Sequence, residues 1–118
     1  MGLEDYRRTQ IQTAPPEKLV LMLYDGALRN VAAADRFLSE GDREGLNRAT
    51  GKAQDILAEL RSSLNYEAGE LADRLAALYD FAARRLMEGN IRQDRRALEE
   101  ARQILRGLRD AWAEMLRS

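Results

Sequence analysis

Apolar residues recur every three or four positions along residues 16–40 and predict a long amphipathic helix. Pro16 suits the first position of this helix, and Gly41 marks its end. The main apolar arc of the predicted helix consists of Leu19, Val20, Leu23, Ala27, Val31 and Leu38. An arc of this width is typical of a helix that packs against neighbours in a bundle.

The same segment also carries apolar side chains that its main arc leaves out. At about 100° per residue, Leu21 and Leu28 lie roughly 60–100° beyond the edge of the arc, and Met22 lies nearly opposite Tyr24. A helix with such a surplus either lies at the centre of its own bundle or offers surface to another chain. This choice decides which function the pattern favours.

Three further segments show helical spacing, with short turn signals between them. The second helix follows Asp42 and the fourth follows Asp94, each able to accept a backbone N–H as a cap, while the third covers about 70–88 and ends at Gly89-Asn90. The arc of the second helix comprises Leu46, Ala49, Ala53, Ile56, Leu57, Leu60 and Leu64. The arc of the third comprises Leu71, Leu75, Leu78, Tyr79, Ala82 and Leu86. The arc of the fourth comprises Leu98, Ala101, Ile104, Leu105, Leu108, Ala111, Trp112 and Met115.

These segments predict an all-α fold, an antiparallel four-helix bundle that forms a single domain over residues 16–118. No segment alternates with the period of a strand. Residues 1–15 are mostly polar, and we expect them to form a short mobile N-terminal arm that can include a helical turn. Gly51 and Gly107 fall inside predicted helices, where a glycine costs about 1 kcal/mol relative to alanine.

Several large apolar residues have no place in the predicted core. Phe81 points about 60° outside the arc of the third helix, among arginines, and Met87 lies off the arc on its other side. Tyr66 lies in a predicted loop, whereas the fourth helix satisfies its own pattern and includes Trp112 in its core stripe. Single exposed apolar residues are normal, so each could simply face a neighbouring helix. Together they favour a surface that accepts an amphipathic helix from another protein.

The composition narrows the chemistry that the chain can perform. With no cysteine and no histidine, its 118 residues lack a thiolate nucleophile and the usual zinc or haem ligands. We therefore expect no enzyme, no cofactor and no metal site. No apolar run approaches the ~20 residues that span a bilayer, so no membrane insertion is expected. The acidic N-terminus differs from the basic start of a signal peptide, which favours a cytoplasmic location.

The charged residues are balanced and interleaved. The chain has nineteen basic residues, seventeen of them arginine, and twenty acidic residues, which gives a net charge of −1. Pairs four residues apart are Asp25/Arg29, Glu44/Arg48, Asp80/Arg84, Arg95/Glu99, Arg96/Glu100 and Arg106/Asp110. Each such pair contributes about 0.2–0.5 kcal/mol and indicates a solvated helix face. Binding of nucleic acid through the arginine-rich residues 92–96 is an alternative, but a phosphate track needs neutral or basic neighbours, so no nucleic-acid partner is expected.

Several motifs occur in order along nearly the whole chain. The N-terminal motif consists of Tyr6, Gln10-Ile11, Thr13-Ala14-Pro15, Leu19 and Met22-Leu23-Tyr24-Asp25-Gly26-Ala27. Later blocks are Ala53-Gln54-Asp55-Ile56-Leu57, Ser63-Leu64-Asn65, Gly69-Glu70-Leu71-Ala72, Leu78-Tyr79-Asp80-Phe81 and Leu108-Arg109-Asp110-Ala111-Trp112. Taken together, these motifs resemble the family of the flagellar secretion chaperone FliS. Pro15 stands where the family commonly has serine, and Gly51 and Gly89 replace better helix formers.

The resemblance implies a cytoplasmic, non-enzymatic export chaperone. Such a protein binds the disordered C-terminal segment of flagellin, prevents premature polymerisation of the filament and delivers flagellin to the gate of the flagellar type III export apparatus. The family is also similar in using its N-terminal arm as a mobile cover, a role that Tyr6 and Ile11 fit by type and place. The expected flagellin-binding residues are Tyr6, Ile11, Leu21, Met22, Leu28, Tyr66, Phe81 and Met87.

The same residues also fit a protein that is not a chaperone. A self-associating helical bundle with a structural or regulatory role would use the same apolar surface as a homodimer interface.

Overall fold

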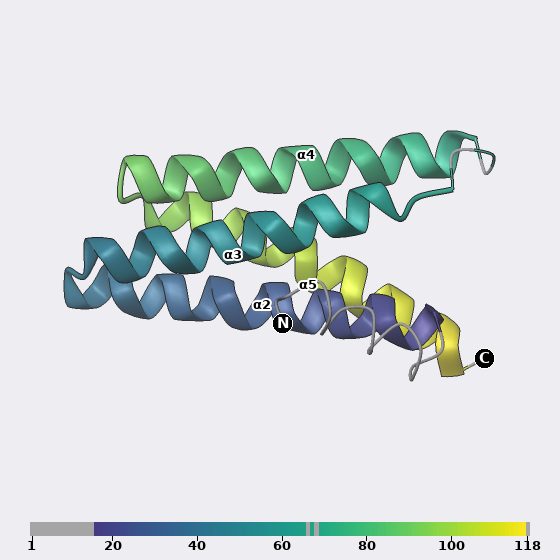
Figure 1. The fold of residues 1–118 in the computed structure, drawn as a ribbon, viewed down its shortest axis with the longest axis horizontal. Helices are drawn as coiled ribbons and strands as arrows, with labels where there is room; N and C mark the ends of the chain where they lie inside the picture. The colour runs from purple at the N-terminus through teal and green to yellow at the C-terminus, as the bar shows by residue number, and fades with distance from the viewer. Residues whose placement is uncertain (1–15, 66, 68, 118) are drawn as a thin grey trace, which may run out of the picture.

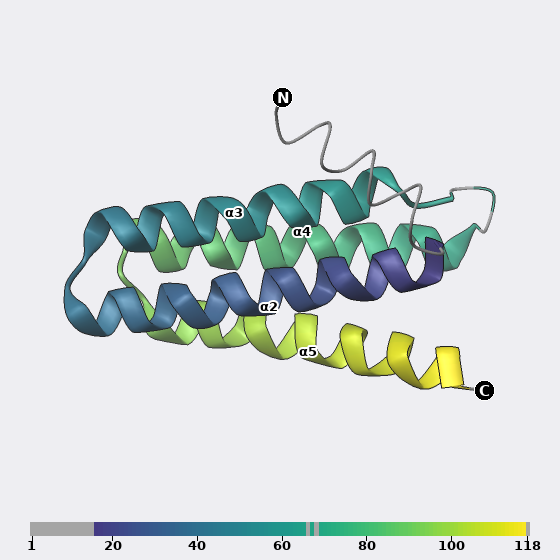
Figure 2. The same cartoon turned by 60° about the horizontal axis from the view of Figure 1, so that its bottom comes forward.

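The protein is a bundle of four antiparallel helices (Figure 1, Figure 2), seen in a computed structural model that describes residues 16–65, 67 and 69–117. The helices are α2 (Pro16–Glu40), α3 (Arg43–Ser62), α4 (Glu70–Ile91) and α5 (Arg95–Arg117). Each helix packs against two others, in the cyclic order α2, α3, α4, α5. The predicted all-α fold is confirmed. The predicted arm, with Tyr6 and Ile11, lies outside the described residues, as does Tyr66.

The first turn between helices forms as the local chemistry predicts. α2 has the predicted bounds. Gly41 follows it with a backbone φ of 71°, which residues other than glycine rarely adopt. The Asp42 carboxylate accepts the backbone N–H of Gly45 at 2.9 Å and caps α3. The chain therefore reverses direction within two residues and places α3 directly against α2.

The end predicted for α4 is wrong. Gly89-Asn90 does not terminate the helix, which continues to Ile91. Gly89 is buried, and a Cβ atom at this position would lie 2.5 Å from the Leu98 side chain. Gly89 is therefore required for close packing of α4 against α5.

The turn between α4 and α5 is made four residues later. Gln93 has a φ of 53°, and Asp94 accepts the backbone N–H groups of Arg96 at 3.0 Å and Ala97 at 3.4 Å. Asp94 thus caps α5 as predicted.

The core is built mostly from leucine and alanine, with one polar pair across its centre. Tyr24 of α2 and Tyr79 of α4 are each 3% exposed, and their hydroxyl oxygens lie 2.6 Å apart in a hydrogen bond. Burial away from water raises the pKa of both hydroxyls above 10.0. Since α2 and α4 lie diagonally opposite in the bundle, this bond spans its interior.

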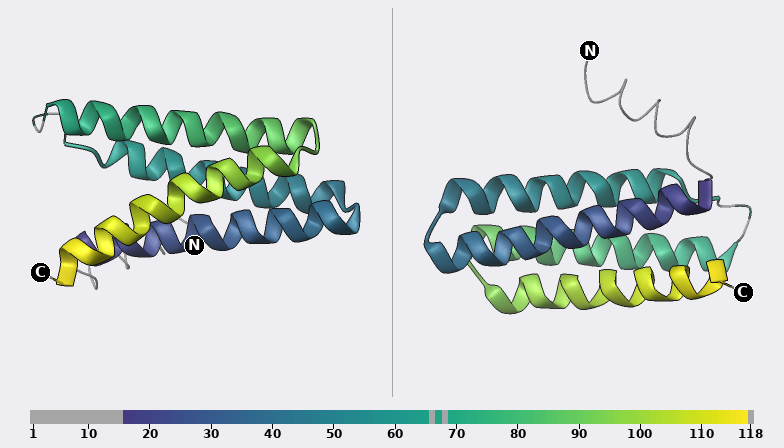
Figure 3. Two further views of the ribbon diagram at one scale, coloured as in Figure 1. Left: turned by 180° about the vertical axis from the view of Figure 1, so that it is seen from behind. Right: turned by 90° about the horizontal axis from the view of Figure 1, so that it is seen from below.

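Two of the predicted core arcs are partly wrong. On α4, Leu71 is 62% exposed and Leu78 is 39% exposed, while Ala72 and Ala76 are buried on the adjoining face. On α5, Met115 is 55% exposed. Ala111 is also exposed, and Trp112 is half-buried against the core. These side chains are exposed because α5 starts beside α4 and diverges from it toward the C-terminus (Figure 3).

Several charges predicted to pair along one helix connect two helices instead. Asp80 pairs with Arg61 at 2.8 Å, and the hydrogen bond from Arg61 lowers the pKa of this carboxyl group. Asp25 and Arg95 likewise pair with residues on a neighbouring helix, at 2.8 Å each. Of the predicted intrahelical pairs, Arg96–Glu100 is present at 3.8 Å. Packing of the helices brings these opposite charges together, which helical spacing alone does not reveal.

Two glycine variants are expected to change stability in opposite directions. A Cβ at Gly107 would meet no heavy atom within 4 Å, so Gly107→Ala should raise the free energy of unfolding by about 0.5–1 kcal/mol through helix propensity. Gly89→Ala should lower it by about 1–3 kcal/mol, because its Cβ overlaps Leu98 and the side chain must move. Urea unfolding of both variants measures the difference. Equal effects of the two changes would contradict the packing role of Gly89.

The tyrosine pair yields a prediction about coupled hydroxyl groups. Tyr79→Phe leaves the buried Tyr24 hydroxyl without its partner, so the free energy of unfolding should fall by about 1–3 kcal/mol. The double variant Tyr24→Phe/Tyr79→Phe should lose less than the sum of the two single variants. Urea unfolding of the parent and the three variants completes this cycle, and strict additivity would show that the two hydroxyls do not interact.

The pH dependence of stability gives an independent check on the same pair. Tyrosines in the unfolded chain release protons from about pH 10, whereas the buried pair keeps its protons because its pKa is raised. The unfolded state therefore binds fewer protons above this pH, and stability should fall as pH rises further. The double phenylalanine variant should show a shallower fall.

Candidate binding surface

α5 begins in close contact with α4 and ends away from it. Near its start, Leu98 packs against Gly89, and Arg85 Nε of α4 lies 2.8 Å from Glu100 Oε2. Farther along, α5 crosses obliquely and reaches the first turns of α2 (Figure 1, Figure 3). The second half of α5 therefore does not cover the first half of α4.

The uncovered side of α4 is apolar. Leu78 and Leu71 lie seven and fourteen residues before Arg85, and a step of seven residues returns to within about 20° of the same side of a helix. They therefore lie on the flank with which Arg85 contacts α5. Both are exposed because α5 has already turned away at their level.

The facing side of α5 is apolar as well. Ala111 lies eleven residues, or about three turns, after Glu100, on the flank that Glu100 turns toward Arg85. Met115 follows one turn later and is 55% exposed. We refer to Leu71 and Leu78 of α4 together with Ala111 and Met115 of α5 as the open flanks.

Phe81 extends the open flank of α4 toward the outside of the bundle. Its ring is 40% exposed, and the Arg84 guanidinium lies 5.9 Å from the ring centroid. A ring and a cation in this arrangement present an apolar surface with a positive edge. The structure thus places Phe81 one turn from Leu78, on the same exposed side of α4.

The other predicted binding residues are more scattered. Met22 on α2 is 41% exposed, and Met87, toward the end of α4, is 46% exposed. Leu21 and Leu28 are half-buried, and Leu28 packs against the core. The structure therefore brings Phe81 close to the open flanks but leaves Met22 and Met87 on other parts of the surface.

The helical pattern does not predict the open flanks. Leu71, Leu78 and Met115 fit the helical spacing of a buried stripe, which predicts that they lie in the core. One signal was present, because Ala72 and Ala76 form a second arc of small apolar residues beside the leucines. A helix with both arcs can bury the alanines closely and leave the leucines for another partner.

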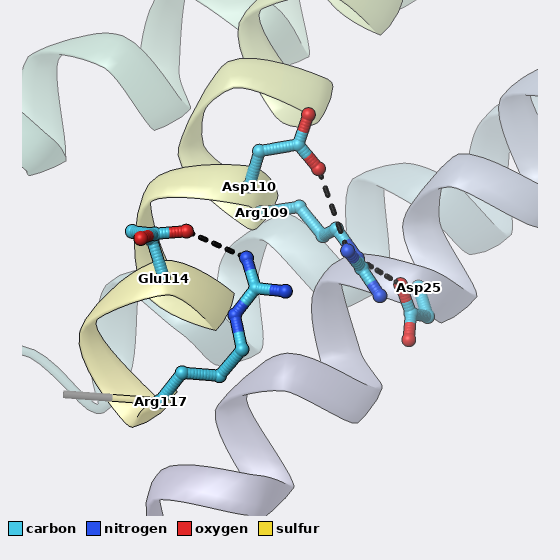
Figure 4. Close-up of polar contacts among 5 residues, drawn as sticks. All are labelled: Asp25, Arg109, Asp110, Glu114 and Arg117. Carbon is cyan, nitrogen blue, oxygen red and sulfur yellow. Dashed lines mark hydrogen bonds and ion pairs between the residues drawn. The ribbon is translucent and has the colours of Figure 1, made fainter.

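Polar contacts join the second half of α5 to α2. Arg109 Nε lies 2.8 Å from Asp25 Oδ1, and Arg109 Nη1 lies 3.4 Å from Asp110 (Figure 4). The hydrogen bond and charge of Asp25 raise the pKa of Arg109 further. One turn later, the Trp112 indole N–H donates to the backbone carbonyl of Glu17 at 2.7 Å. These contacts account for the half-buried position of Trp112, which the sequence placed in the core stripe.

Neither a metal site nor a membrane-spanning helix is found among the described residues. Within residues 16–65, 67 and 69–117, no cluster of three or more acidic side chains is arranged to hold a metal ion. No helix in this part of the chain is long and apolar enough to cross a membrane.

Comparisons with known proteins agree over nearly the whole chain. A family model described as flagellar protein FliS matches residues 2–118. The flagellar secretion chaperone FliS of Bacillus subtilis (strain 168) is 36% identical, over 96% of this chain and 84% of that protein. The protein of the same name from Escherichia coli (strain K12) is 37% identical, over 92% of this chain and 81% of that protein.

A solved structure shows the same fold. The crystal structure of a bacterial flagellar chaperone aligns with 98% of this chain and 97% of its own, at a TM-score of 0.80 and 20% sequence identity. At this identity the likeness concerns the fold alone.

Proposed function

The chain belongs to the FliS family of flagellar secretion chaperones, and from this membership we propose that it binds the disordered C-terminal segment of flagellin in the cytoplasm. In this role it prevents flagellin from polymerising before export and delivers it to the gate of the flagellar type III export apparatus. It acts by binding alone, without catalysis or a cofactor.

The observation that supports this proposal is the exposure of the open flanks. Leu71 and Leu78 on one side and Met115 on the other are large apolar residues at helical spacing, each at least 39% exposed. A disordered segment that folds into an amphipathic helix can bury its apolar stripe against such flanks. The ordering of the segment opposes binding, so the affinity stays moderate for the area buried and the cargo can be released.

The proposed contact surface combines the predicted residues with those that the structure adds. From the sequence come Tyr6, Ile11, Leu21, Met22, Leu28, Tyr66, Phe81 and Met87, and from the structure Leu71, Leu78, Ala111 and Met115. Residues on three helices can contact a long segment that wraps around the bundle, which fits the scattered positions of Met22 and Met87.

The N-terminal arm acts as a cover in this proposal. In the free protein, residues 1–15 cover some of the flagellin-binding surface through Tyr6 and Ile11, and the incoming segment displaces them. Such a cover shields apolar surface from other chains until flagellin arrives.

Charged substitutions on the open flank of α4 should weaken flagellin binding without unfolding the bundle. Leu78→Asp and Phe81→Asp each remove a large apolar contact, and we expect the dissociation constant for the flagellin C-terminal segment to rise about 10- to 100-fold. Isothermal titration with a peptide of this segment measures the change.

Ile91→Asp is the matched control, because Ile91 is 65% exposed at the far end of the same helix. It introduces the same charge and should change the affinity less than about twofold. Melting temperatures should be similar for all three variants, and a large drop for Phe81→Asp would assign Phe81 to the core. A parent protein that gives no titration heat and forms dimers in light scattering would instead favour the self-associating bundle.

Removal of the arm should strengthen flagellin binding. Without residues 1–14 the free protein has no cover to displace, so the affinity should rise by about three- to tenfold. Isothermal titration of the shortened and full-length proteins tests this, with circular dichroism to verify that the helices are intact. Weaker binding by a fully folded shortened protein would show that the arm contributes contacts and is not a cover.

A further inference from the structure

Two contacts attach the second half of α5 to α2. Arg109 pairs with Asp25 and the Trp112 indole donates to Glu17 O, at 2.8 and 2.7 Å. The two acceptors on α2 are eight residues apart, which corresponds to about 12 Å along a helix. Two attachments at this spacing fix both the position and the direction of α5 relative to α2.

The exposed apolar side chains on the same half of α5 favour a different position, against α4. Ala111 and Met115 are exposed on the side of α5 that faces α4, and Leu71 and Leu78 are exposed on the corresponding side of α4. If α5 continued along α4, these side chains would bury one another and remove apolar area from water. The contacts with α2 oppose this closure.

The Arg109–Asp25 pair is suited to such a role by its environment. The side chains of Arg109 and Asp25 are 33% and 37% exposed, so the surrounding helices partly shield the pair from solvent. Asp110, next to Arg109 on α5, provides a second carboxylate at 3.4 Å (Figure 4). The guanidinium therefore lies between acidic groups of both helices and favours the geometry in which α5 stays against α2.

We propose that Arg109 and Asp25, together with Trp112, form a strut that holds the second half of α5 away from α4 and keeps the open flanks available to a helix of the bound segment. The identity of that segment as the C-terminal part of flagellin rests on the proposed function. Arg109 is a positioning residue in this proposal, since it faces α2 and acts on binding through the path of α5.

The distance between α4 and the end of α5 is the direct test of the strut. The chain has no cysteine, so Ala77→Cys on α4 and Arg117→Cys on α5 give two unique sites for spin labels. In the folded protein with the strut intact, the label distance should be long and narrowly distributed. Arg109→Met should add a population at shorter distance, in which α5 has closed on α4.

A matched control lies at the other end of the same helix pair. Arg95 of α5 pairs with Asp35 of α2 at 2.8 Å and is close to Ser39, far from the open flanks. Arg95→Met removes a more exposed ion pair between the same two helices and should leave the label distance unchanged. Arg109→Lys keeps the positive charge and should restore most of the long-distance population. If Arg109→Met lowers the helix content, Asp25→Asn provides a milder removal of the same pair.

Binding provides the second measurement. Molecules in which α5 has closed on α4 cannot bind, so the apparent affinity falls in proportion to the fraction of molecules that stay open. Arg109→Met should therefore bind the flagellin segment about three- to tenfold more weakly. Arg95→Met should bind as the parent does. An unchanged or longer label distance in both Arg109→Met and Asp25→Asn overturns the strut. A shorter distance, in a protein whose parent form does not bind the flagellin segment, upholds the strut and contradicts the proposed function instead.

Discussion

The direction of α5 depends on contacts with two different helices, one at each end. At its start, the absence of a side chain at Gly89 lets Leu98 approach α4 closely. Near its end, Arg109 and Trp112 bind to α2. A straight helix that meets both demands must cross the bundle obliquely, and it uncovers the first half of α4 as it does so. The exposed leucines of α4 follow from this constraint.

The sequence predicts local features well because neighbouring residues determine them. Pro16 begins α2, and the short side chains of Asp42 and Asp94 cap α3 and α5 without help from distant parts of the chain. The helical arcs likewise identify most of the core. Prediction fails where the path of another helix decides the outcome. Leu71 and Leu78 have the spacing of core residues, but their burial depends on where α5 goes.

Gly89 is a second position where the local sequence does not reveal the role of the residue. Glycine near the end of an apolar pattern is typical of a helix terminus, and in α4 it serves close packing inside the helix. Asp25 pairs with Arg109, eighty-four positions away, and not with the arginine one turn along. In both cases the competing contact comes from a helix that is distant in sequence, and no local pattern contains it.

The hydrogen bond between Tyr24 and Tyr79 limits how far the bundle can adapt. Leucine and alanine contacts are forgiving, since one helix can slide by a turn of about 5.4 Å and find similar neighbours. Two hydroxyls that meet inside an apolar interior allow no such slippage, because a shift would separate them and leave both without a partner. The pair therefore fixes the axial register of α2 against α4. The bundle can then act as a rigid template, and in the proposed binding of flagellin the conformational change falls to the flagellin segment.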